Sequence, residues 1–180
     1  APLGARFVPP LLEETPMKRL MAAALFCTAL AQAALQNGMP DTAANPKAAA
    51  LSQAQYRNPV WLYDYDVPGD GKYSAKVFLQ SIKPLGGNWF SVVSEHKPKR
   101  KSAPVMRILD WVRCGGQPDS VMTALVLSSP KGQILQMADV HSAASPQDLD
   151  AATIKRIQDE DKNEPAHVKK MTDFVCKKAK

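Results

Sequence analysis

Apolar and polar residues alternate in short runs through the middle of the chain, between residues 60 and 140. This alternation is typical of antiparallel β-strands that bury one face. Turns are indicated at 68–71 and 86–88, and the expected strands are residues 60–63, 73–79, 89–93, 105–114, 121–127 and 134–140. Because short turns join successive strands, the sequence predicts a meander of about six antiparallel strands.

After His141 the spacing of apolar residues changes to a helical period. Ser145 and Pro146 are typical of a helix start, and the short amphipathic segment that follows contains Leu149, Ile154 and Ile157. After a polar break at 159–164, Pro165 begins a final helix with the apolar face Val168, Met171, Phe174 and Val175. The pattern predicts an α+β domain over residues 58–180, with an antiparallel sheet and a C-terminal helix.

An apolar run without charges, residues 20–30, follows the basic pair Lys18 and Arg19 and precedes Ala31-Gln32-Ala33. These are the parts of a secretory signal peptide, which we assign to residues 17–33. The run is too short for a membrane-spanning helix, which needs roughly 20 residues, so the mature form is expected to lack one. Because a signal peptide acts at a chain's N-terminus, residues 1–16 are interpreted as an upstream remnant or a misplaced start.

Residues 34–57 are rich in Ala, Gln and Pro and contain few bulky apolar side chains. Such a composition buries too little surface to offset the entropy of ordering. We therefore interpret the segment as a flexible tether. A short helix within it is compatible with Asn45 as N-cap, Pro46 in the first turn and the helix formers that follow.

Removal of the signal peptide reduces the cysteines from three in the whole chain to two, Cys114 and Cys176. In an oxidising compartment this pair is most simply one disulfide, which would fasten the last helix to the sheet. Two free thiols or a metal pair are the alternatives. Cys27 follows the bulky pair Leu25-Phe26 and does not fit a lipidation site, so we expect a secreted or periplasmic protein, without support for outer-surface display.

The charge is mildly basic, with 23 Lys and Arg residues against 17 Asp and Glu. Four cations stand within five residues, namely Lys97, Lys99, Arg100 and Lys101. This cluster is interpreted either as a solvated hairpin tip or as a docking patch for an acidic protein segment or a sulfated glycan. A nucleic-acid partner is not expected, because the chain is exported and has no nucleic-acid-binding motif.

Signatures of catalysis are missing from the sequence, which has no nucleophile elbow, zinc-protease motif or phosphate loop. Asp64, Asp66 and Asp70 resemble a calcium loop, but Pro68 and Ala75 stand where an EF-hand needs ligands. We therefore expect no enzyme, no cofactor and no metal site. A Ser/His/Asp arrangement assembled from distant residues stays open.

Two further side-chain sets are assigned to structure rather than chemistry. Asp139 and His141 have the spacing of metal ligands on a strand face, and a surface pair is the simpler interpretation. The aromatic residues at alternating strand positions are mostly expected in the core; they are Trp61, Tyr63, Tyr73, Trp89, Phe90 and Trp111.

Four segments resemble the surface-adhesin protein E family of Gram-negative bacteria. They are Trp61, Phe78-Leu79-Gln80-Ser81-Ile82, Ile108-Leu109-Asp110-Trp111-Val112-Arg113-Cys114 and Phe174-Val175-Cys176, and together they span most of residues 59–176. The resemblance implies an antiparallel sheet with a C-terminal helix tied to it by a disulfide. It also implies a non-enzymatic binding domain, since the family includes an adhesin for host extracellular proteins. Its binding residues have no match here.

The sequence thus predicts an exported binding domain for a host extracellular protein or a polyanion. Two alternatives stay open. One is a periplasmic enzyme or small-ligand carrier that uses the concave face of the sheet, and the other is an envelope-assembly factor that uses an exposed sheet edge.

Overall fold

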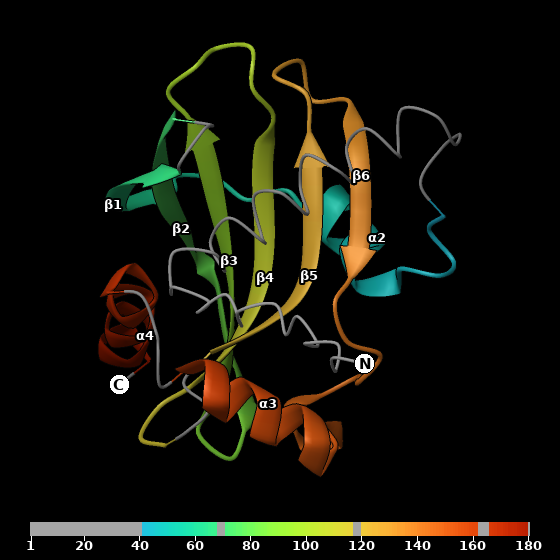
Figure 1. The fold of residues 1–180 in the computed structure, drawn as a ribbon, viewed down its shortest axis with the longest axis vertical. Coiled ribbons are helices and arrows are strands. Elements are labelled where there is room, and N and C mark those ends of the chain that lie inside the picture. The colour runs from blue at the N-terminus through green and yellow to red at the C-terminus, as the bar shows by residue number, and fades with distance from the viewer. Residues whose placement is uncertain (1–40, 68–70, 117–119, 162–165, 180) are drawn as a thin grey trace, which may run out of the picture.

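Six antiparallel strands form one sheet in the computed structural model, which describes residues 41–67, 71–116, 120–161 and 166–179 (Figure 1). The strand order is β1-β2-β3-β4-β5-β6, so the predicted meander and the α+β fold are confirmed. The strands are β1 (Val60–Val67), β2 (Gly71–Gly86), β3 (Trp89–Pro98), β4 (Val105–Arg113), β5 (Ser120–Ser128) and β6 (Ile134–Asp139).

Several predicted features lie outside the described residues. They are the signal peptide at 17–33, residues 1–16 before it, residues 34–40 of the tether, the centre of the 68–71 turn, and Pro165. Within the part of the chain that is described, no helix combines the length and the apolar character needed to cross a bilayer.

Strand β3 is longer than the alternation predicts. His96, Lys97 and Pro98 were expected in a loop, but they continue β3 because Pro98 pairs with Tyr73 on β2 and His96 pairs with Met106 on β4. Pairing on both sides gives these residues a ladder that their own polar sequence does not indicate. The connection to β4 is therefore confined to residues 99–104.

Both faces of β3 are covered. The neighbouring residues Val92 and Val93 point to opposite faces, and they are 0% and 1% exposed. Val93 belongs to a cluster with Leu51 of helix α2 (Pro46–Gln53), whereas Val92 belongs to a cluster with Val175 of helix α4 (Ala166–Lys178). The sheet is therefore packed between helices from the two ends of the described chain (Figure 1).

Residues 46–53 of the predicted tether form α2, the short helix that Asn45 and Pro46 allow, and this helix packs on the sheet. Ala48 and Leu51 are buried among side chains of β2, β3, β5 and β6. The carboxylate of Asp139 accepts hydrogen bonds from the backbone N–H groups of Lys47 (3.1 Å) and Ala48 (2.7 Å). The predicted N-cap, Asn45, instead accepts a hydrogen bond from the Asp139 N–H through its side-chain oxygen. Hydrogen bonds with a distant residue thus hold α2 against the sheet, which the composition of the segment does not predict.

The predicted disulfide is confirmed, since Cys114 Sγ and Cys176 Sγ are 2.07 Å apart. It joins the residue after β4 to the last turn of α4, which packs through Met171 and Val175. The side chain of Val168 lies outside the described set. The C-terminal helix is therefore held by both apolar contacts and a covalent bond.

Helix α3 (Ala151–Asp161) and the short helix η1 (Pro146–Asp148) lie at the lower end of the sheet in Figure 1. Leu149 and Ile157 pack there against Trp89, Trp111 and Val121. The polar break predicted at 159–164 begins too early, because α3 continues to Asp161. The packing of Ile157 stabilises the last turns of α3, and the polar residues that follow it form the end of the helix.

We expect loss of the disulfide to destabilise the fold strongly. The Cys114→Ser/Cys176→Ser variant frees a loop with a sequence separation of 62 residues, which costs about 4 kcal/mol by chain entropy. Thermal unfolding measures the effect: a reductant should lower the melting temperature of the wild-type protein to that of the variant. A variant that melts with the oxidised wild type would contradict the role of the bond.

We expect Asp139→Asn to loosen α2, because the partly buried carboxylate accepts hydrogen bonds from two backbone N–H groups and pairs with Lys47 at 3.7 Å. The free energy of unfolding should fall by about 1–2 kcal/mol. The control is Asp173→Asn, which removes an exposed ion pair with Lys169 and should cost at most about 0.5 kcal/mol. Urea unfolding of both variants tests this, and equal losses would sink the capping role.

Candidate functional site

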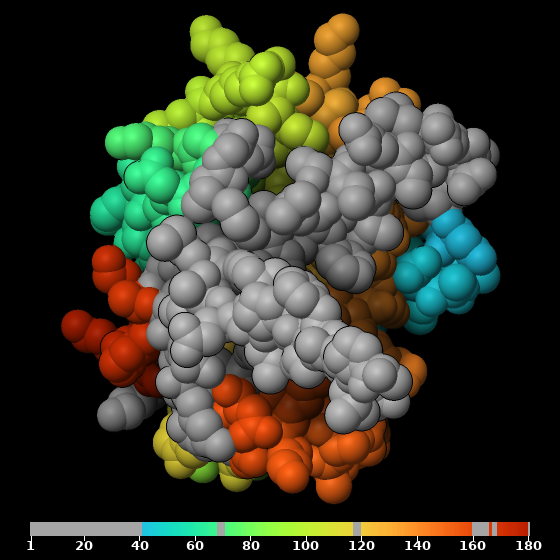
Figure 2. All heavy atoms as spheres, viewed as in Figure 1, coloured from blue at the N-terminus to red at the C-terminus, as the bar shows by residue number. Residues whose placement is uncertain are grey.

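A cluster of cations lies at one end of the sheet, which we call the basic end. In a meander the ends of β1, β3 and β5 lie together, and Figure 2 shows the connections after β3 (yellow-green) and β5 (orange) projecting from this end. The basic end is formed by the exposed residues Lys72, Lys97, Lys99, Arg100, Lys101 and Lys131. Two described carboxylates, Asp64 and Asp66, lie on the neighbouring strand β1.

The structure keeps the four predicted cations together and adds two more. The backbone N–H of Lys99 donates to the carbonyl of Lys72 at 2.8 Å, which places β2's first residues beside the predicted cluster. Lys131 lies in the turn after β5. Both could have been found by counting strands, because alternate turns of a meander share an end. Lys97, however, lies in β3 rather than in the loop.

Lys99 is the member of this cluster that has an anionic partner. Its Nζ lies 2.6 Å from Asp64 Oδ2, and the two side chains are 54% and 42% exposed. An ion pair this exposed is screened by solvent and contributes little to stability. Within the described part of the chain, Lys97, Arg100 and Lys101 form no ion pair. Most of the charge of the cluster is therefore presented to solvent.

Asp64 organises the surface beside the basic end. Its second oxygen, Oδ1, accepts a hydrogen bond from Trp61 Nε1 at 3.0 Å. The hydrogen bonds from Lys99 and then from Trp61 lower the pKa of Asp64 to about 2, so the carboxylate stays ionised throughout the physiological range. One carboxylate thus fixes both a lysine and an indole.

Trp61 is the exception among the aromatic residues that the sequence assigns to the core. It is 59% exposed, whereas Tyr63, Tyr73, Trp89 and Trp111 are buried. The cause is a β-bulge in β1: Trp61 pairs with Lys76 but Tyr63 pairs with Ala75, so the register shifts between them. A bulge moves the next side chain to the other face of the sheet. Period-two alternation places both aromatics on one face and so misses this.

The strongest candidate for catalysis is a hydrogen-bonded chain on the face that α4 packs against. His96 Nδ1 and the Tyr65 hydroxyl are 2.8 Å apart, and His96 Nε2 and Ser94 Oγ are 3.0 Å apart. The sequence places His96 in a polar context beside lysine, but it is 7% exposed, and Ser94 is completely buried. A substrate cannot reach a hydroxyl in that position. These hydrogen bonds therefore serve to satisfy polar groups that are buried in the core.

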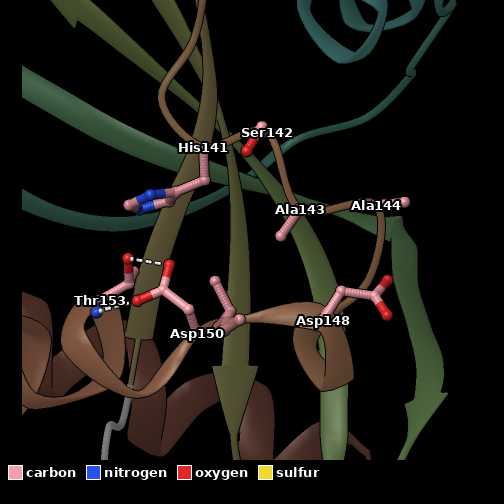
Figure 3. Close-up of a pocket in the computed structure, with 8 residues that line it drawn as sticks. His141, Ser142, Ala143, Ala144, Asp148, Asp150 and Thr153 are labelled. Carbon is pink, nitrogen blue, oxygen red and sulfur yellow. Dashed lines mark hydrogen bonds between the residues drawn. The ribbon is translucent and has the colours of Figure 1, made fainter.

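A cavity of about 300 Å³ lies beside η1 and the start of α3. In Figure 3, His141 and Asp150 lie on the same side of this cavity, and Asp148 points away from them. Asp148 accepts hydrogen bonds from the N–H and the hydroxyl of Ser145, and Asp150 accepts them from the N–H and the hydroxyl of Thr153. The Thr153 hydrogen bonds lower the pKa of Asp150. Both carboxylates therefore cap helices.

The described residues contain no group of three or more His, Cys, Asp and Glu side chains that could hold a metal. The surface pair predicted for Asp139 and His141 is also wrong, since Asp139 caps α2 with a side chain that is 10% exposed. The calcium resemblance concerns Asp64, which instead contacts Lys99, and Asp66; Asp70 lies outside the described residues.

Comparison of the chain with protein-family models, with curated proteins and with solved structures gives no match. The resemblance to the surface-adhesin protein E family stays a prediction.

We expect Asp110 to make stability depend on pH. Asp110 is partly exposed as a residue, but its carboxyl group is buried, which raises its pKa from 3.8 to about 7. Burial, and then the charge of Asp110, also raise the pKa of Tyr63. The folded state therefore binds more protons than the unfolded state between pH 4 and 7. The free energy of unfolding should fall as pH rises through that window, by up to roughly 4 kcal/mol.

Asp110→Asn should remove this dependence, because the amide does not ionise. Urea unfolding between pH 4 and 8 measures it, with the variant more stable than the wild type at pH 8 and similar to it near pH 4. Parallel stability profiles for the two proteins would show that Asp110 is not the titrating group.

Proposed function

We propose that the chain is an exported, non-enzymatic binding domain and that its basic end docks onto an acidic macromolecule. The observation that carries the proposal is the convergence of six exposed cations from three parts of the sheet at one end. The resemblance to the adhesin family supports a host extracellular protein or an extracellular polyanion as the partner. The disulfide is compatible with the oxidising compartment that export requires.

Electrostatics explains why this arrangement suits docking. Like charges on neighbouring turns repel one another, and a polyanion bound across them relieves that repulsion. Charges of one sign also raise the local concentration of an oppositely charged partner and speed association. Because exposed charges are screened beyond about 8–10 Å at physiological ionic strength, binding through the basic end should weaken as salt is added.

The candidate sites for other chemistry support binding in preference to catalysis. The Ser94 hydroxyl is buried, and the carboxylates beside the 300 Å³ cavity are occupied as helix caps. The basic end, in contrast, presents cations that are already solvated. A docking surface requires that accessibility, whereas a catalytic acid or base requires a perturbed environment.

We expect the variant with Ser at Lys97, Lys99, Arg100 and Lys101 to bind polyanions at least about tenfold more weakly at low salt, a loss of about 1.4 kcal/mol. The probes are heparin and polyglutamate, measured by calorimetry between 50 and 300 mM salt. The variant should also show a weaker dependence on salt, because fewer ion contacts are lost.

The matched control replaces Lys169, Lys170, Lys177 and Lys178 of α4 with Ser. These four residues are also exposed, so both variants lose the same net charge, but the control keeps the basic end. It should bind both probes within about twofold of the wild type. Equal weakening of the two variants would mean that net charge alone drives binding, and unchanged binding by the first variant would refute the proposal.

A further inference from the structure

Helix α2 covers only part of the sheet face on which it packs. The surface of β1–β3 beside the basic end lies on that face but outside the part that α2 covers. Lys76 is next but one to Phe78, which contacts the α2 cluster, so both point to that face. Helix α2 makes most of its contacts with β4, β5 and β6, and reaches β2 and β3 at Phe78 and Val93. On the uncovered part lie Trp61, Asp64, Ser74, Lys76 and Lys97, with Lys99 beside them, and we call this set the tryptophan–lysine face.

Strand pairing places these residues in two rows. Trp61 pairs with Lys76 in one row, and Lys76 in turn pairs with Glu95, whose carboxylate lies 3.5 Å from Arg107 Nε. In the other, Asp64 pairs with Ser74, which in turn pairs with Lys97. Directly paired residues of an antiparallel sheet have Cβ atoms about 4.5–5.5 Å apart, so one flat ring, three ammonium groups and a hydroxyl share a compact surface with two carboxylates, Asp64 and Glu95, which pair with Lys99 and Arg107.

The indole of Trp61 is positioned as well as exposed. The Nε1–H, which is the one polar group of the indole, donates a hydrogen bond to Asp64, so the ring has no unsatisfied donor. Of the aromatic side chains in the described ranges, Trp61 is the one that is more than a third exposed, at 59%. An exposed tryptophan keeps a large apolar area in water. The hydrogen bond holds the ring in place while its apolar face stays exposed, which suits a ligand that covers this face.

We propose that the ligand of the basic end is an acidic polysaccharide, with a sugar ring stacked on Trp61 and its sulfate or carboxylate groups paired with Lys76, Lys97 and Lys99. This inference rests on the proposed function and narrows its ligand class. A pyranose ring has an apolar C–H face and a rim of hydroxyl groups. The indole matches that C–H face, Ser74 and Asp64 match the hydroxyl groups, and the lysines match the anionic substituents.

The other polyanions fit this face less well. Single-stranded nucleic acid is bound by stacking successive bases on several aromatic side chains, and this face presents one. An acidic peptide supplies negative charge without a ring that alternates apolar and hydroxylated surfaces. Both are therefore comparison ligands in the experiment.

The experiment measures binding of the wild-type chain, Trp61→Ala and Val60→Ala to heparin, polyglutamate and a single-stranded oligonucleotide at constant ionic strength. Val60 is the matched control, since it is adjacent and 37% exposed. Trp61→Ala should lose about fivefold or more in affinity for heparin, as expected for one aromatic contact, and should bind polyglutamate within about twofold of the wild type. Val60→Ala should bind all three ligands as the wild type does.

Tryptophan fluorescence gives a second readout that does not depend on affinity. The chain has three tryptophans, and Trp89 and Trp111 are buried, so an emission shift on adding heparin should come from Trp61 and disappear in Trp61→Phe. Lys76→Ser should lower the affinity for heparin by a larger factor than it lowers the affinity for polyglutamate.

The outcomes separate this inference from the proposed function. If Trp61→Ala binds heparin unchanged, or loses the same factor for heparin and polyglutamate, the polysaccharide assignment fails while docking by the basic end stands. A loss larger for the oligonucleotide than for heparin overturns it in favour of nucleic acid. If the variant with Ser at Lys97, Lys99, Arg100 and Lys101 binds every ligand like the wild type, the proposed function itself fails.

Discussion

Strand β3 needs cover on both faces, and the rest of the structure depends on that requirement. Val92 and Val93 are buried on opposite faces, and helices α4 and α2 respectively cover them. The helices that do so have 8 residues in α2 and 13 in α4, and helices this short are marginal alone. Each is fastened to the sheet by a specific bond, α2 through the Asp139 carboxylate and α4 through the disulfide.

The covering of the sheet also decides where a binding surface is available. Helices α2 and α4 occupy the two faces, and α3 and η1 occupy the end opposite the basic end (Figure 1). The strand ends that carry the cations stay exposed to solvent, where the charged groups keep their hydration and carry no desolvation penalty. The exposed ion pair between Lys99 and Asp64 neutralises one charge of the group, and the remaining cations repel one another.

Local patterns were sufficient for the features that depend on neighbouring residues. The meander, the last helix and the cysteine pair follow from period-two alternation, helical spacing and cysteine number, and the structure confirms them. Features set by distant partners were missed. The short helix at α2 was allowed by Asn45 and Pro46, but its packing on the sheet was not foreseen, because it depends on Asp139, 91 residues beyond Ala48. The burial of His96 depends on pairing with β2 and β4. Of the site, the cluster of Lys97, Lys99, Arg100 and Lys101 was predictable, and the exposure of Trp61 was not, because it depends on a bulge.

That bulge connects the core to the candidate binding surface. By shifting the register between Trp61 and Tyr63, it lets β1 bury one aromatic side chain under the sheet and present the other on the opposite face. Asp64 lies three residues after Trp61 and opposite Ser74, so the register that buries Tyr63 also brings the carboxylate within reach of the indole and of Lys99. A slip of β1 by one residue would move Trp61 to the buried face and Asp64 away from Lys99. The ring and the cations are therefore arranged by the same pairing that completes the core, and the surface exists in this form when the edge strand is correctly docked.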